Sequence, residues 1–271
     1  MEKERLYNYL IHFTDRVQSE GRYTFTFSEV KNTFAITENA LRVALNRLVR
    51  KGKVVNVRKG FYVIVPPEYS ERGILPPPLF VNELMTFLDK PYYVGLLSAA
   101  AMHGAGHQQP QEFFLVTVKP AMRQIQCKGV WINFITKSNM PQTGLEQRKT
   151  DTGFITVSGP ELTALDLVQF ENRIGGLNRV ITVLEELAEK LDATRLIEFL
   201  TKTNIATAYL QRFGFILGEA LAMQELAGVV DAHLQTKEYY RIALKPDAPK
   251  TGYPMDKRWK VFVNMTLESD F

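Results

Sequence analysis

Residues 37–52, TENALRVALNRLVRKG, have the spacing of an amphipathic helix that ends at a glycine. At about 100° per residue, the apolar side chains of this stretch fall on one stripe, which consists of Leu41, Ala44, Leu45 and Leu48. Thr37 has the side chain of a good N-cap, and Gly52 stands where a helix commonly ends. We therefore predict a helix from residue 38 to about residue 51.

The side of this helix that faces away from the apolar stripe is polar and basic. It carries Asn39, Arg42, Val43, Asn46 and Arg50, with Arg47 at its edge. Glu38, beside the cap, is the one acidic residue of the helix. Amide and guanidinium groups recognise the edges of adenine and guanine in the major groove, so this composition favours a DNA-reading helix over a generic solvated face.

The neighbouring sequence predicts the other parts of a small DNA-binding domain. Residues 4–19 have the period of an amphipathic helix, and the alternation in residues 23–27 predicts a short strand. Ser28 is the expected N-cap of a short helix that runs through Phe34. After the longer helix, residues 53–57 and 61–65 form an expected hairpin with a basic tip, Arg58-Lys59-Gly60. This order of elements indicates a winged helix-turn-helix over residues 1–68.

The expected DNA contacts follow from these positions. Hydroxyl and backbone N–H groups at the two helix starts can bind phosphate, as can the basic side chains of the hairpin. The predicted DNA-binding residues are Ser28, Thr37, Asn39, Arg42, Val43, Asn46, Arg47, Arg50, Lys53, Arg58 and Lys59.

The distribution of charge along the chain agrees with a phosphate-binding N-terminus. Residues 1–70 hold 12 Lys/Arg and 7 Asp/Glu, whereas the remaining 201 residues hold 21 and 22. Such an asymmetry is typical of a surface that binds nucleic acid. No apolar run reaches the ~20 residues of a membrane span, no secretory signal is recognised, and one cysteine, Cys127, excludes an internal disulfide. A cytoplasmic protein is expected.

A proline-rich linker, residues 69–79, separates the expected DNA-binding domain from a larger α+β domain, residues 80–271. That domain has β-rich runs at 113–118, 130–135 and 154–157, which predict a small sheet. From Pro160 the pattern becomes helical, with helices expected at about 161–171, 177–190, 193–202, 205–217 and 219–227. The predicted fold class is therefore mixed α/β (α+β), with a mostly helical C-terminal half.

No residues form a recognisable catalytic, metal or cofactor site. His103 and His107 have the i, i+4 spacing of two metal ligands, but Gly104 and Gly106 between them weaken a helix. The chain lacks a phosphate-binding loop, a dinucleotide fingerprint and a nucleophile elbow. We expect no catalytic residue, metal or cofactor and no enzyme, although a nuclease built from scattered acids stays open as an alternative.

Several segments, in this order along the chain, resemble the AbiEi-type antitoxins of type IV bacterial toxin–antitoxin systems. They are residues 37–48 with Gly52, residues 60–63, 92–104 (YYVGLLSAAAMHG), 160–166 (PELTALD) and 212–217 (RFGFIL). Residues 228–271 match no part of the family that we can assign.

The resemblance implies that the winged helix binds operator DNA and represses the operon. It also implies that the C-terminal domain counteracts a nucleotidyltransferase toxin of abortive-infection systems without forming a stable complex with it. Besides the nuclease, two alternatives remain: a winged-helix adaptor that binds a protein, and a stand-alone transcription factor without antitoxin activity.

Overall fold

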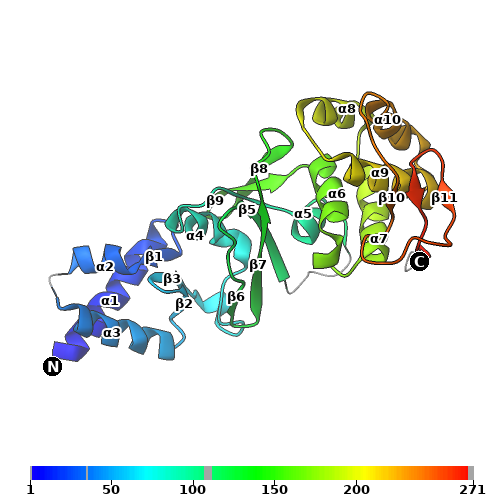
Figure 1. Cartoon of the computed structure of the whole chain (residues 1–271). Coiled ribbons are helices and arrows are strands. Elements are labelled where there is room, and N and C mark those ends of the chain that lie inside the picture. Colours follow the sequence, from blue (N-terminus) through cyan, green and yellow to red (C-terminus); the bar gives the residue numbers. More distant parts are fainter. Residues whose placement is uncertain (1, 35, 107–111, 268–271) are drawn as a thin grey trace. The chain divides into compact units, whose positions relative to one another are not determined.

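The computed structural model describes residues 2–34, 36–106 and 112–267. Contacts between residues divide the chain into two compact units. Unit 1 contains residues 1–92, 111–140 and 147–156, and unit 2 contains residues 93–110, 141–146 and 157–271. Helices and strands occur in both units (Figure 1), so the predicted mixed α+β class is confirmed.

The first part of unit 1, residues 2–65, is here called the N-terminal module. Its elements are α1 (Glu2–Ser19), β1 (Thr24–Thr26), α2 (Phe27–Thr33), α3 (Glu38–Arg50), β2 (Val54–Arg58) and β3 (Phe61–Ile64). The three strands form an antiparallel sheet in the order β1-β3-β2. The order of elements is the one that the sequence predicts, and their ends differ from the expected ones by a few residues.

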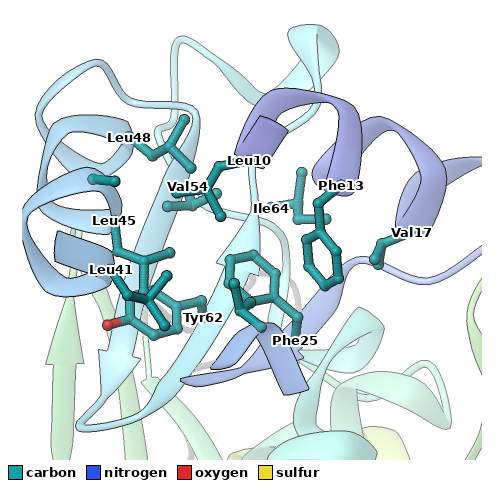
Figure 2. Packing of buried hydrophobic residues seen from close by; sticks show 12 residues of the cluster. Leu10, Phe13, Val17, Phe25, Leu41, Leu45, Leu48, Val54, Tyr62 and Ile64 are labelled. Atoms are coloured by element: carbon teal, nitrogen blue, oxygen red, sulfur yellow. The ribbon is translucent and has the colours of Figure 1, made fainter. Parts of the chain in front are cut away.

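Apolar side chains from all three strands and from α1 and α3 form the core of this module (Figure 2). The Phe25 and Tyr62 rings stack with centroids 5.2 Å apart, and Phe13 meets Phe25 edge-on at 5.5 Å. Leu41, Leu45 and Leu48 of α3 point into this core and are fully buried. The core therefore fixes which side of α3 faces solvent.

The predicted linker contains packed residues. It includes part of a short 3-10 helix (Pro67–Tyr69) and contains all of a second one (Pro77–Leu79), and the side chains of Ile74 and Leu75 between them are fully buried. Burial of two large aliphatic side chains stabilises a fixed path for this segment rather than an extended spacer. The boundaries at residues 68 and 80 stay a prediction.

The larger sheet has the strand order β6-β7-β5-β4-β9-β8. Strands β5 and β7 are parallel, as are β4 and β9, whereas β6 and β7 are antiparallel. The elements of this region are α4 (Val81–Phe87), β4 (Tyr92–Val94), β5 (Glu112–Val118), β6 (Ile125–Cys127), β7 (Val130–Lys137), β8 (Leu145–Thr150) and β9 (Gly153–Ser158). Strands β6 and β8 were not among the predicted ones.

Unit 2 is mostly helical, as predicted. Its elements are α5 (Leu96–Met102), α6 (Pro160–Gln169), η3 (Glu171–Arg173), α7 (Leu177–Leu187), η4 (Ala188–Lys190), α8 (Ala193–Lys202), α9 (Thr207–Phe215), the π-helix η5 (Ile216–Ala220), α10 (Gln224–Leu234), β10 (Ile242–Ala243), β11 (Met255–Asp256) and β12 (Val261–Phe262). The predicted helix at 219–227 is wrong, because the chain breaks between η5 and α10, where Ala222 has a φ of +54°.

Candidate nucleic-acid interface

Helix α3 begins as its sequence predicts. Thr37 is its N-cap, and the Thr37 Oγ1 accepts a hydrogen bond from the Ala40 backbone N–H at 3.3 Å. Gly52 follows the C-cap with a φ of +67°, a conformation that costs glycine little. The four apolar residues of the predicted stripe are buried. Together, the cap and the stripe leave the predicted reading face of α3 toward solvent.

The start of α2 differs from the prediction. Its N-cap is Thr26, not Ser28, and Ser28 lies exposed in the first turn of the helix. Thr26 and Glu29 form a reciprocal capping box in which the Thr26 Oγ1 accepts from the Glu29 backbone N–H at 3.1 Å. The Thr-x-x-Glu spacing in the sequence is a signal that would have identified this cap.

The predicted contact residues lie mostly in solvent. Exposed side chains are those of Ser28, Thr37, Asn39, Arg42, Val43, Asn46, Arg47, Arg50, Lys53 and Lys59. Arg58 is half-buried. The structure thus brings six of these side chains together on one face of α3 and places Lys59 at the turn of the β2–β3 hairpin.

Two arginines of α3 lean on aromatic rings from neighbouring helices. The Arg42 guanidinium lies over the Phe27 ring of α2, 4.6 Å from its centroid. The Arg47 guanidinium lies over the Tyr7 ring of α1 at 4.5 Å, and the Lys51 ammonium lies 4.4 Å from the centroid of the same ring. These cation–π contacts restrict where the charged groups can stand.

The acid of α3, Glu38, is neutralised by its neighbours. Its carboxylate lies 2.6 Å from the Lys31 ammonium and 3.7 Å from the Arg42 guanidinium. The hydrogen bond and charge of Lys31, with a smaller contribution from Arg42, lower the pKa of Glu38. Within the described part of the chain, no carboxylate pairs with Arg50, Lys53 or Lys59. The outer surface of α3 and the hairpin turn is therefore positive.

The tip of the β2–β3 hairpin packs against α2 and α4 on one side. Gly60 has a φ of +85°, and the Gly60 carbonyl accepts a hydrogen bond from the Phe27 backbone N–H at 2.8 Å. The Phe61 ring lies 5.4 Å from the Phe87 ring of α4. Of the three tip residues, Lys59 is exposed, whereas Arg58 and Gly60 are half-buried, so Lys59 is the tip residue that is free to contact a ligand.

Sequence reasoning missed three residues that shape this surface, which are Tyr7, Phe27 and Lys31, and it left Lys51 out of the predicted contact residues. Tyr7 and Phe27 act through space from other helices, and no spacing within α3 signals their contacts. Lys51 could have been included from its charge and its position at the end of the helix.

Charge is divided between the two units. Unit 1 holds 20 Lys/Arg and 12 Asp/Glu, a net charge of +8, whereas unit 2 holds 13 and 17, a net charge of −4. The excess of positive charge thus belongs to the unit that contains α3. A positively charged surface of this kind attracts a polyanion.

The polar side chains of the PELTALD segment, residues 160–166, make hydrogen bonds within the chain. In the PELTALD segment, Glu161 accepts from the Arg195 guanidinium at 3.0 Å, and the Thr163 hydroxyl lies 2.7 Å from that of Ser158. Asp166 accepts from the Tyr93 hydroxyl at 2.6 Å. These contacts stabilise the fold of unit 2.

The histidine pair of the sequence does not form a describable site. His103 Nε2 lies 2.7 Å from the Ser158 carbonyl oxygen, and His107 lies outside the described residues. Over residues 2–34, 36–106 and 112–267, no group of three His, Cys, Asp or Glu side chains is placed to hold a metal ion. No helix in those ranges has the length and apolar character needed to cross a membrane.

Unit 2 also contains a cavity of about 690 Å³. Its lining includes Ile181, Phe215, Val263 and Met265 and also the side chain of Glu219. None of the predicted contact residues lines it.

Comparison with known proteins identifies part of the chain. Residues 93–219 match the family model of the AbiEi antitoxin C-terminal domain, so the resemblance to AbiEi-type antitoxins is confirmed over this segment. The structure is similar to the crystal structure of the RV2827C protein from Mycobacterium tuberculosis, with a TM-score of 0.63 and 16% sequence identity. That similarity covers 92% of this chain and 89% of the other, and it shows a shared fold. No curated protein matches the sequence.

Proposed function

We propose that the N-terminal module is a winged helix-turn-helix that binds double-stranded DNA, with α3 in the major groove and the β2–β3 hairpin as the wing. The observation that carries this proposal is the exposed face of α3, where amide and guanidinium groups surround Val43 and the one acid is paired with two cations. These are the groups that recognise base edges. The net charge of +8 on unit 1 supports attraction to phosphates.

In this proposal the contact residues have two roles. Side chains of the exposed α3 face approach the bases, and the cations around them hold the phosphates. The residues assigned to this interface are Ser28, Thr37, Asn39, Arg42, Val43, Asn46, Arg47, Arg50, Lys53, Arg58 and Lys59. We keep the proposed boundaries, with a DNA-binding domain over residues 1–68, a linker over 69–79 and an antitoxin-type domain over 80–271.

We further propose that the chain is a cytoplasmic transcriptional repressor that also serves as the antitoxin of a type IV system, where it counteracts a nucleotidyltransferase toxin. The AbiEi antitoxin C-terminal domain over residues 93–219 supports this part of the proposal. Neither activity requires catalysis by this chain or a stable complex with the toxin.

DNA binding is tested by an electrophoretic mobility shift with the DNA that lies upstream of the gene. The Arg42→Ala/Asn46→Ala/Arg50→Ala variant should lose specific binding, because each well-placed bidentate contact contributes roughly 1–3 kcal/mol of base discrimination. The control is Arg241→Ala/Lys257→Ala, which removes the same number of positive charges, two, from exposed positions of unit 2. This variant should bind DNA like the unchanged protein.

Unchanged binding by the triple variant would remove α3 from the interface. Absence of any DNA shift at moderate salt, together with a protein that co-purifies through the α3 face, would instead indicate the adaptor.

Antitoxin activity is tested separately by co-expression with the nucleotidyltransferase expected from the neighbouring gene. Growth should be rescued by the unchanged chain and by the α3 triple variant, because the antitoxin activity is assigned to the C-terminal domain. A toxin that stays lethal in the presence of the unchanged chain would contradict the antitoxin assignment and leave the DNA-binding assignment standing.

A further inference from the structure

The exposed side chains of α3 differ in their freedom to move. Arg42 is held on one side by the Phe27 ring and the Glu38 carboxylate, and Arg47 is held on the other by the Tyr7 ring. Because Phe27 belongs to α2 and Tyr7 to α1, these contacts draw both guanidiniums toward the flanks of α3. The middle of the exposed face is left to shorter side chains.

These shorter side chains and one arginine form a line along α3. Asn39, Val43, Asn46 and Arg50 are spaced by four, three and four residues. At about 100° per residue they lie within roughly 60° of one another, on the side opposite the buried leucines. We call these four residues the α3 ridge. Its first three members span about 10 Å of helix, or about three base steps.

Val43 is the unusual member of the ridge. Its branched apolar side chain is 52% exposed and lies between two asparagines of the ridge. The major groove offers one apolar group, the C5 methyl of thymine, and asparagine pairs with the N6 and N7 edge of adenine. Thymine and adenine belong to the same base pair, so a valine flanked by asparagines is complementary to consecutive A·T pairs.

We infer that the α3 ridge selects A·T base pairs, with Val43 against a thymine methyl and Asn39 or Asn46 on a neighbouring adenine. This inference rests on the proposed DNA binding and adds the class of sequence that is bound. Arg42 and Arg47 then flank the α3 ridge, with Arg42 toward α2 and Arg47 toward α1.

The test uses the full chain and a pool of random-sequence DNA duplexes. The best-bound sequence is selected, and each thymine in it is replaced singly by deoxyuridine, which lacks only the C5 methyl. At one or more positions this replacement should weaken binding by about fourfold, the effect of withdrawing one methyl group from an apolar contact.

The Val43→Ala variant should bind the thymine and deoxyuridine duplexes with the same affinity. Alanine is a stronger helix former than valine, so α3 is expected to stay folded in this variant. Ile197→Ala provides the matched control, because Ile197 is also 52% exposed on a helix, α8 of unit 2. This control should keep the fourfold preference for thymine.

Three outcomes separate the inference from the proposed function. A selected site made of G·C pairs, or deoxyuridine effects that are as large in Val43→Ala as in the unchanged chain, would overturn the inference while DNA binding stands. Failure to bind any duplex at low salt would contradict the proposed function itself. A methyl effect that disappears only in Val43→Ala supports both.

Discussion

Tyr93 and Asp166 form a hydrogen bond in the interior of unit 2, with both side chains almost fully buried. Burial, together with the nearby Asp166 carboxylate, raises the pKa of the Tyr93 hydroxyl, which therefore remains a hydrogen-bond donor at neutral pH. The bond joins the YYVGLLSAAAMHG segment to the PELTALD segment. Two segments that resemble the antitoxin family are thus linked by a structural contact rather than by a binding site.

Replacing Tyr93 with phenylalanine should destabilise the chain while leaving its DNA binding intact. The change removes a donor from a buried carboxylate, and hydrogen bonds to charged groups contribute about 1.5–3 kcal/mol. Urea unfolding at neutral pH should show a loss of that size in the free energy of unfolding. Equal stability of the two proteins would show that another group can take the place of the hydroxyl.

Glu171 predicts a pH dependence of stability. Its side chain is buried, its Oε1 has no hydrogen-bond partner in the described part of the chain, and burial raises its pKa above 4.5 although Arg212 and Lys245 oppose the shift. A raised pKa in the folded state means that the stability linked to this group is present below the unfolded pKa and is lost as the pH rises through the folded pKa.

Glu171→Gln should therefore become more stable than the unchanged chain as the pH rises from the ordinary pKa of 4.5 through the raised pKa of the folded state, because glutamine cannot ionise. Thermal unfolding of both proteins across this range measures the difference. A difference that does not change with pH would show that ionisation of Glu171 has no part in it.

At the scale of elements, α9 packs directly on a residue from the end of the chain. Trp259 is fully buried, and a Cβ added at Gly214 would lie 2.0 Å from a ring carbon of Trp259. The Gln211 side chain also donates to the Trp259 carbonyl oxygen at 2.7 Å. The RFGFIL segment thus requires glycine at position 214, and residues beyond the AbiEi match complete the core around it.

Gly214→Ala should lower the free energy of unfolding by about 1–3 kcal/mol, the usual cost of overpacking a core. Gly218→Ala is the matched control, since a Cβ there meets Ala227 at 3.4 Å and Trp259 at 3.8 Å, which are ordinary contacts. Denaturant unfolding of both variants tests the packing. Equal stability of the two would contradict the close approach of α9 to Trp259.

Elements with a strong periodic signal were predicted well from the sequence, and those defined by distant partners were not. The stripe of α3 stands out in the sequence because its apolar residues face one core, and β5 stands out as a run of consecutive apolar residues that are buried. Strand β8 reads Leu-Glu-Gln-Arg-Lys-Thr and has no apolar alternation, so pairing in the sheet alone makes it a strand. The π-helix η5 likewise depends on the packing of its neighbours.

At the scale of the whole molecule, the sequence located the polar face of α3 but not its surroundings. Tyr7 and Phe27, which draw Arg47 and Arg42 to the flanks, come from other helices. Residues 111–140 and 147–156 belong to the same compact unit as the N-terminal module, although they are far from it in the sequence. Contacts between distant segments have no local signal in the sequence. The net charge of residues 1–70 alone is therefore smaller than the net charge of +8 of the whole of unit 1.

The most direct test of DNA recognition by α3 is a fluorescence anisotropy titration of a labelled duplex at several salt concentrations. The unchanged chain should bind with a steep loss of affinity as salt rises, with a slope of about −0.9 in log K against log salt for each phosphate contacted. The Arg42→Ala/Asn46→Ala/Arg50→Ala variant should bind more weakly, with a shallower slope and a weaker preference between sequences. Identical affinity, slope and sequence preference in the two proteins would contradict the assignment of α3 as the DNA-reading helix.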